Sequence, residues 1–427
     1  MKLNLASKAL LLTSAFLSEQ QQGIVDAACP FAHLFGSSSS STEQGHYHDA
    51  HPTNNENLAT KDDPIHSSIN TNLDRTKITD ERRKLQASCG TDFVFTTALY
   101  EQIQTEIAEI AAGKNLQNGE RGRFFGGILR LAAHDFMDFN RLAAAGTEGG
   151  SDGCLVFHEE DNKGLEAIWV PDSQDTVHPV PLVQLLYEDI YEPMGMSRAD
   201  YWVAMANAVV KISSPDQAYD LPFRYGRISN EDCSFTEGRQ PKANGCSDIQ
   251  TVFIERMGVT WTDATALMGG HTLGGGSEAS SGHAGIWDDT RAGSAEFNND
   301  YYDELLNRSW RPRLDGADLA HDWTWAGNNN NDAPFLMLHT DVCLYFDIPE
   351  DGTAHCCTDT GGNCRNNDIQ NIQCPTSQVV RPEAFAAVEL FSNSNNIGVR
   401  SDAIFDEAVF DEAECKCALY ESYVYCL

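Results

Sequence analysis

The chain has 427 residues and a formal net charge of -34 at pH 7, with 63 acidic and 29 basic residues. This length is too great for one simple core and suits one large two-lobed domain or two domains. The negative charge excludes nucleic acids and anionic membrane surfaces as natural partners, because both would be repelled.

The first residues are typical of a secretory signal. Lys2 and Lys8 flank the start, Ala9–Leu17 is an apolar run, and small residues suited to cleavage follow up to Ala27. The run is too short to span a bilayer. We therefore predict a signal peptide over residues 1–28 and a secreted, extracellular protein, with a cytosolic amphipathic start as the alternative.

Residues 29–88 have a different composition from the rest of the chain. Ser37–Ser41 is a serine run, and histidines are scattered among polar residues with few apolar positions between them. Such a stretch cannot bury enough surface to fold, so we predict a disordered pro-segment or linker. The basic cluster Arg82–Lys84 at its end is a candidate processing site.

The cysteine count favours disulfides. The chain has 13 cysteines, and removal of the segment with Cys29 leaves an even number between Cys89 and Cys426. An even set in a secreted chain predicts up to six disulfides, whose pairing the sequence leaves open. Structural zinc is the alternative, but paired Cys-x-x-Cys motifs are absent.

From residue 92 onward the hydrophobic spacing is mainly helical. Thr260 is placed as an N-cap with Asp263 as its capping-box partner. Glycine- and asparagine-rich loops separate the helices, and there is no internal repeat, so we predict a mainly α fold with disulfide-tied loops. The predicted helices are Phe93–Ala112, Arg121–Asp135, Leu182–Tyr191, Tyr201–Ile212, Thr260–Gly270, Asn299–Arg308 and Arg381–Phe391.

Arg130 and His134 are the first candidate catalytic residues. They are four residues apart, so on a helix both side chains project from one face. A neutral imidazole can accept and return a proton, and a guanidinium can stabilise charge on a departing oxygen. Taken alone, such a pair is an ordinary surface or packing feature.

The segments Gly149–Cys154 and Glu160–Leu165 follow shortly after His134. With them, the chain resembles the plant, fungal and bacterial haem peroxidase superfamily. The resemblance implies that His134 is the acid/base, that Arg130 polarises the peroxide bond, and that Asn162 accepts the ring N–H of His134.

Ala266–Gly274 closely resembles the proximal helix of the same superfamily. Small residues around a helical histidine let a flat ligand approach closely. The resemblance implies that His271 is the axial ligand of a haem b iron, since such haems require a ligand of this type. A satisfied core histidine is the alternative.

Two later segments, Gly282–Trp287 and Phe335–Asp341, resemble the cytochrome c and ascorbate peroxidase class. The resemblance implies that Asp341 accepts the Nδ1–H of His271 and that Trp287 packs beside it and could hold a radical. Simple core packing is the alternative for Trp287. Arg239, within Gly238–Pro241, is implied near the haem edge or its propionates, unless it is an exposed arginine.

Asp135, Asp152 and the carbonyl of Gly150 resemble the distal calcium site of the secreted members, and hard oxygen ligands suit calcium. Acidic loop residues in water are the alternative. Cys154 departs from the family pattern, because it stands where those members usually carry serine.

Two further departures bear on the electron donor. Ala133 stands where the intracellular class has an aromatic residue, which argues against catalase-peroxidase behaviour and opens the distal pocket. Ser280 stands where ascorbate peroxidases carry an arginine, so ascorbate is not the expected donor. Cytochrome c does not suit a secreted chain. Small phenolic or other aromatic donors are therefore expected.

The resemblance implies a two-lobed helical peroxidase fold with haem between the lobes. We assign this domain to residues 89–355, with a Cys-rich extension over 356–427 packed on it. The expected activity reduces hydrogen peroxide while small donors are oxidised in one-electron steps. The alternatives are a non-catalytic secreted Cys-rich binding or matrix protein with the same fold, and a non-haem metalloprotein that uses His158, Glu159 and Glu160.

Overall fold

The computed structural model describes most of the chain between residues 94 and 392. It leaves out residues 118, 171–180, 216–220, 222, 241, 278–280, 314–321, 326–334, 351–355 and 359–371 within this span. The predicted signal peptide, the predicted linker over 29–88, Ser280 and the cysteines that follow Cys374 lie outside the described residues.

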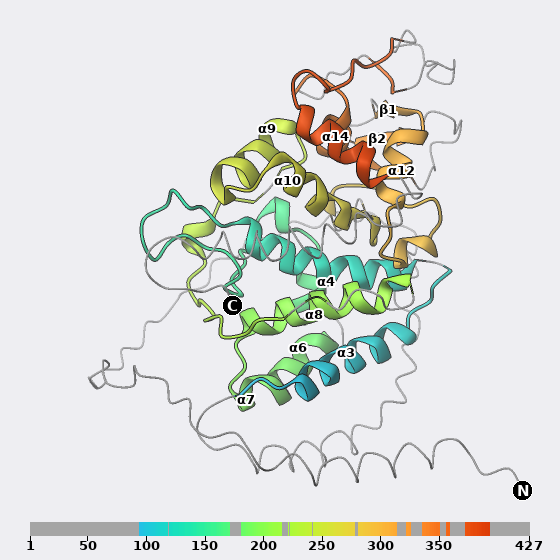
Figure 1. Cartoon of the computed structure of the whole chain (residues 1–427). Coiled ribbons are helices and arrows are strands. Elements are labelled where there is room, and N and C mark those ends of the chain that lie inside the picture. Colours follow the sequence, from blue (N-terminus) through green and yellow to red (C-terminus); the bar gives the residue numbers. More distant parts are fainter. Residues whose placement is uncertain are drawn as a thin grey trace, which may run out of the picture. The chain divides into compact units, whose positions relative to one another are not determined.

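Helices dominate the described residues, which confirms the predicted mainly α fold (Figure 1). The α-helices are α3 (Thr97–Ala112), α4 (Glu120–Met137), α5 (Glu166–Trp169), α6 (Leu182–Leu186), α7 (Glu192–Met194), α8 (Arg198–Ser213), α9 (Cys246–Ile249), α10 (Trp261–Met268), α12 (Asp300–Asn307), α13 (His339–Tyr345) and α14 (Pro382–Phe391). Five of the seven predicted helices match these bounds closely. Two break up: residues 187–191 and 269–272 continue α6 and α10 as a π-helix and a 3-10 turn.

The helices α3, α4 and α8 pack against one another, with α8 in contact with both of the others (Figure 1). Every residue of α8 from Ala199 to Val210 is buried, because apolar and small residues extend around most of the helix. Ser197 caps its N-terminus by accepting the amide of Asp200. The helix that carries Arg130 and His134 thus lies against a fully buried partner.

A second set of helices is built around α10, which packs against α14 (Figure 1). The helix α13 contacts both α9 and α14. Tyr345 of α13 stacks on Phe385 of α14 with ring centroids 4.4 Å apart, and Tyr302 of α12 meets Phe391 at 5.2 Å. The described part of the C-terminal extension therefore shares one hydrophobic core with the preceding helices.

A small antiparallel sheet was not predicted. Its strands are β1 (Trp310–Pro312), β2 (Asp322–Trp325) and β3 (Met337–Leu338), in the order β1-β2-β3. Trp310 pairs with Trp325, and Trp323 pairs with Met337. Strands this short carry no alternating pattern that a sequence could reveal. The strand β3 leads directly into α13, which carries Asp341.

Disulfides tie the loops, as predicted. Cys154 pairs with Cys233, Cys246 with Cys343, and Cys356 with Cys374. Cys357 is also disulfide-bonded. The first two bonds join cysteines that are 79 and 97 residues apart in the sequence. Closing a long loop lowers the conformational entropy of the unfolded chain more than closing a short one.

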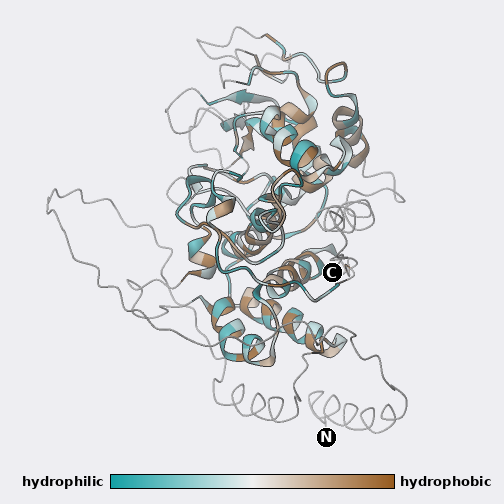
Figure 2. Ribbon diagram, turned by 90° about the vertical axis from the view of Figure 1, so that its left-hand side faces the viewer, coloured by the Kyte–Doolittle hydropathy of each residue, from teal (hydrophilic) through white to brown (hydrophobic). Residues whose placement is uncertain are grey.

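Hydrophobic and hydrophilic residues are mixed within the individual helices (Figure 2). Among the described residues, none of the helices combines the length and the apolar character needed to span a bilayer.

Candidate active site

Arg130 and His134 lie one turn apart on α4, where the guanidinium Nε donates to the imidazole Nε2 at 3.3 Å. The remaining nitrogens of Arg130 donate to two carbonyl oxygens, that of Lys163 at 2.9 Å and that of Asp161 at 2.6 Å. The loop around residue 162 therefore fixes the guanidinium beside the imidazole.

Asn162 lies on the other side of the His134 ring. Its Oδ1 is 2.8 Å from His134 Nδ1, and its Nδ2 donates to the carbonyl of Val156 at 3.0 Å. Because the amide nitrogen already donates, Oδ1 faces the ring as an acceptor, so His134 carries its proton on Nδ1. Nε2 is left as the basic nitrogen.

The surroundings of His134 keep the imidazole neutral. Burial is the main cause and the nearby Arg130 charge adds to it, so the pKa of His134 falls to about 3. Burial also lowers the pKa of Arg130, to about 10, which leaves the guanidinium charged near neutral pH. The pair thus consists of a neutral base next to a fixed positive charge.

His271 lies in a 3-10 turn, η6 (Gly269–Thr272), directly after α10. The predicted capping box at Thr260 and Asp263 is present at the start of α10. A Cβ at residue 269 would collide with the hydroxyl of Tyr302, which belongs to α12. The backbone just before His271 therefore approaches α12 so closely that residue 269 must be glycine.

Asp341 is fully buried and brings the proximal residues together. His271 Nδ1 lies 2.9 Å from its Oδ1, and Trp287 Nε1 donates to its Oδ2 at 2.7 Å. The Trp287 and His271 rings stack with centroids 4.4 Å apart and planes 17° apart. The tryptophan therefore touches the histidine and shares its carboxylate.

Tyr301 is a member of this cluster that sequence reasoning missed. Its hydroxyl donates to Asp341 Oδ1 at 2.9 Å, and its ring meets the edge of the His271 ring at 6.0 Å. The predicted helix 299–308 contained it, but no motif distinguished it from core tyrosines. The usable signal was that a buried tyrosine hydroxyl requires an acceptor.

The donor set fits a haem iron. Asp341 occupies Nδ1 of His271, so Nε2 remains for a ligand, and the His271 side chain is 32% exposed while that of Asp341 is 0% exposed. The two histidines lie close enough for His271 to lower the pKa of His134. An available imidazole nitrogen and a separate acid/base pair are the groups that a peroxidase haem needs on its two sides.

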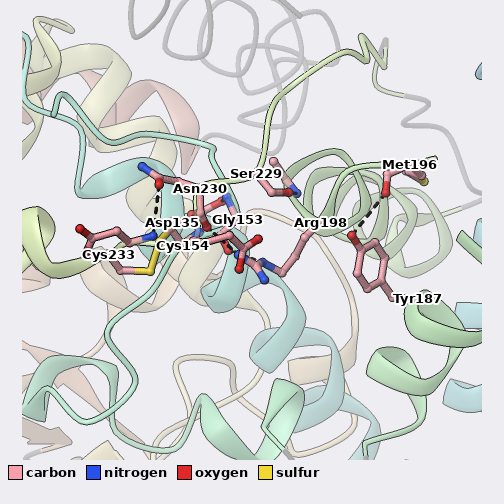
Figure 3. A network of polar contacts seen from close by, with 12 residues as sticks. Asp135, Gly153, Cys154, Tyr187, Met196, Arg198, Ser229, Asn230 and Cys233 are labelled. Atoms are coloured by element: carbon pink, nitrogen blue, oxygen red, sulfur yellow. Dashed lines mark hydrogen bonds and ion pairs between the residues drawn. A yellow bond between two sulfur atoms is a disulfide. The ribbon is translucent and has the colours of Figure 1, made fainter. Parts of the chain in front are cut away.

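Asp135, one of the predicted calcium ligands, has other partners. Both carboxylate oxygens of Asp135 accept backbone amides, those of Gly153 and Cys154, each at 2.9 Å. Arg198 holds the same loop by donating to the Gly153 carbonyl at 2.6 Å, beside the Cys154–Cys233 disulfide (Figure 3). Asp135 therefore anchors the loop that follows α4.

Two other acidic side chains, Asp138 and Asp152, each have one buried carboxylate oxygen without a hydrogen-bond partner in the described structure. Gly150 donates its amide to the second oxygen of Asp138 at 2.7 Å. Burial raises the pKa of Asp138 well above its ordinary value and that of Asp152 to about 6. Nowhere in the described ranges do three or more His, Cys, Asp or Glu side chains gather to hold a metal ion.

Arg239 donates to the carbonyls of Thr147 and Glu148 at 2.8 and 3.0 Å, and its guanidinium lies over the Phe235 ring. The described structure shows no hydrogen bond or ion pair between Arg239 and either histidine. The residues of the metalloprotein alternative do not form a metal-holding group in the described part of the chain. Glu159 accepts the Gly238 amide and Glu160 pairs with Lys163, while His158 is exposed.

A family model described as Peroxidase matches residues 108–351, more than half of the chain. The match begins within α3 and ends after α13, so it contains both candidate histidines and their carboxylate and amide partners.

Curated relatives agree with this match. The chain is 33% identical over 185 residues to "L-ascorbate peroxidase 5, peroxisomal" of Arabidopsis thaliana. The aligned region covers 42% of this chain and 57% of that protein. It is 24% identical over 253 residues to "Putative heme-binding peroxidase" of Pyricularia oryzae, covering 58% and 76%. The chain thus spans little more than half the length of the ascorbate peroxidase that it matches.

Proposed function

The chain belongs to the peroxidase family, and we propose that it is a haem-dependent peroxidase that reduces hydrogen peroxide and oxidises small donors in one-electron steps. One observation carries the proposal: His271 keeps Nε2 for iron while its Nδ1 bonds to Asp341, a carboxylate that also accepts from Trp287. A structural relic would have no need for this arrangement together with Arg130, His134 and Asn162.

Bound haem b would supply the iron and the electrons for peroxide reduction, with His271 as the proposed ligand. His134 Nε2 takes the proton from one peroxide oxygen and returns it to the other. Arg130 stabilises the negative charge on the departing oxygen. Asn162 keeps the His134 proton on Nδ1, so that Nε2 is always the accepting nitrogen.

Two further proximal roles are proposed. Asp341 draws the Nδ1 proton of His271 towards itself, which increases the electron density that the ring can donate. Trp287 is the proposed site of a protein radical, a role supported by its stacking on His271 and its hydrogen bond to Asp341. The role of Arg239 near the haem edge or its propionates stays a prediction, because its hydrogen bonds to the Thr147 and Glu148 carbonyls do not test it.

For the donor, we propose a small phenolic or other aromatic molecule. The names of the relatives favour ascorbate as a second candidate. Ser280, which stands in place of the ascorbate-peroxidase arginine, lies outside the described residues. A comparison of turnover with a simple phenol and with ascorbate at equal concentrations decides between the two donors.

We also propose that the protein is secreted, since the predicted signal peptide and the disulfides both suit an oxidising compartment. Some relatives carry the words peroxisomal or cytosolic in their names.

We also propose a calcium site near Asp135, Gly150 and Asp152, supported by the buried oxygens of Asp138 and Asp152 that lack a hydrogen-bond partner in the described structure. Because both oxygens of Asp135 already accept backbone amides, the proposed ligand set centres on Asp138 and Asp152. We expect calcium to raise the thermal unfolding temperature of the wild type, whereas D152N shows a smaller rise. An equal rise in both proteins would remove Asp152 from the site.

The experiment that tests the proposed function is an optical spectrum of the full chain loaded with haem, before and after one equivalent of hydrogen peroxide. We expect a Soret band that shifts on addition of peroxide and returns when a donor is added. The non-catalytic alternative predicts either no Soret band or a band that peroxide leaves unchanged.

A further inference from the structure

One oxygen of Asp341 serves two side-chain donors. Tyr301 donates its hydroxyl to Oδ1 at 2.9 Å, and His271 Nδ1 lies 2.9 Å from the same oxygen. The other oxygen, Oδ2, accepts from Trp287 Nε1 at 2.7 Å and from the Leu338 amide at 2.6 Å. Tyrosine and histidine therefore compete for the same acceptor atom, Oδ1, whereas the tryptophan bonds to the other oxygen.

Packing holds the Tyr301 hydroxyl in this place. Tyr301 is fully buried in α12, and its ring packs edge-on against Tyr302 with centroids 4.9 Å apart. Burial and the adjacent Asp341 carboxylate raise the pKa of Tyr301 well above its ordinary value, so the hydroxyl keeps its proton and remains a donor. The competition on Oδ1 is thus built into the fold.

We propose that Tyr301 is a positioning residue that limits how strongly Asp341 polarises His271. A carboxylate oxygen that already accepts one hydrogen bond is a weaker acceptor for the next, so the imidazole retains more of its neutral character. A less anionic imidazole donates less electron density to the iron. It therefore stabilises the higher oxidation state of the iron to a smaller extent. The inference rests on the proposed function, since it assumes that His271 holds the haem iron.

The test compares Y301F with the wild type as full-length, haem-loaded proteins. We expect the ferric/ferrous midpoint potential to shift to a more negative value, because Asp341 then bonds more strongly to His271. The iron–histidine stretching frequency of the ferrous protein should rise for the same reason. Neither readout requires turnover, so both separate tuning of the iron ligand from a loss of activity.

Y302F is the matched control, because it removes a buried hydroxyl at the neighbouring position. The Tyr302 hydroxyl donates to the carbonyls of Thr265 and Ala266 at 2.9 and 3.2 Å, and the described structure shows no hydrogen bond between it and Asp341. We therefore expect the Y302F potential to match that of the wild type. An equal shift in Y301F and Y302F would overturn the inference, and so would an unchanged or more positive potential in Y301F.

A second variant covers the case in which Y301F does not fold. A fluorinated tyrosine at position 301 keeps the ring and strengthens the hydroxyl as a donor, so the potential should move the opposite way, to a more positive value. Absence of that shift contradicts the proposed role of Tyr301. Absence of a Soret band in the wild type contradicts the proposed function instead, so the two failures are distinguishable.

Discussion

Replacement of His134 by leucine should slow the reaction with hydrogen peroxide by about 10²- to 10⁴-fold, the range expected for loss of one general acid/base. Leucine has a similar volume but cannot accept the peroxide proton. Arg130 would remain held by the Lys163 and Asp161 carbonyls, so the variant isolates the proton transfer. Stopped-flow absorbance at the Soret band measures the rate constant.

The control is H158L, which makes the same substitution at an exposed histidine of the following loop. We expect its rate constant to equal that of the wild type. H134L should still bind haem, although Asn162 Oδ1 loses its partner at a cost of about 1–3 kcal/mol in stability. A wild-type rate in folded, haem-loaded H134L would end the acid/base assignment.

The pH dependence follows from the same imidazole. Its pKa of about 3 means that His134 is neutral, and able to accept a proton, at every pH well above that value. The rate constant for the peroxide reaction should therefore stay level from pH 8 down to about pH 5. It should fall only as the pH approaches 3, when Nε2 becomes protonated. A decline centred near 6.5, the ordinary histidine pKa, contradicts the buried geometry.

Replacement of His271 by alanine should abolish stoichiometric haem binding, because it removes the only proposed iron ligand. Asp341 would keep its hydrogen bonds from Trp287, Tyr301 and Leu338, so the buried carboxylate remains paired and the fold should survive. Titration with haem, followed at the Soret band, measures the loss. Added imidazole should restore part of the band by filling the space left by the ring.

The chain offers a matched control for this variant. His283 also bonds through Nδ1 to a buried aspartate, Asp322 Oδ1 at 2.7 Å, and its side chain is 28% exposed. H283A therefore removes a histidine with the same kind of partner and similar exposure. We expect H283A to bind haem as the wild type does. Haem loss in H283A together with retention in H271A would transfer the ligand assignment to His283.

Much of the local structure could be predicted from the sequence. Hydrophobic spacing indicated the helices, and the four-residue separation of Arg130 and His134 placed them on one face of α4. Thr260 and Asp263 form the expected capping box. These features depend on contacts within about one helical turn, which residue order alone specifies.

Other expectations came from the resemblance to known peroxidases rather than from local rules. His271 and Asp341 are 70 residues apart, and His134 and Asn162 are 28 apart. Spacing does not predict that such pairs meet, because the path of the intervening chain decides it. The motifs around these residues predicted the pairs, and the structure gives their distances.

Packing alone decided the remaining features. Tyr301 reaches the His271–Asp341 pair because α12 lies against η6, which carries His271. The short strands leading to α13 had no pattern to reveal them. Asp135, expected to bind calcium, gives both oxygens to backbone amides of a loop that Arg198 holds in place. The sequence thus determined which groups are present and how each helix presents them. Only the tertiary structure decided which acceptor each donor reaches, because a buried polar group takes whichever partner the packing of distant segments brings within hydrogen-bond distance.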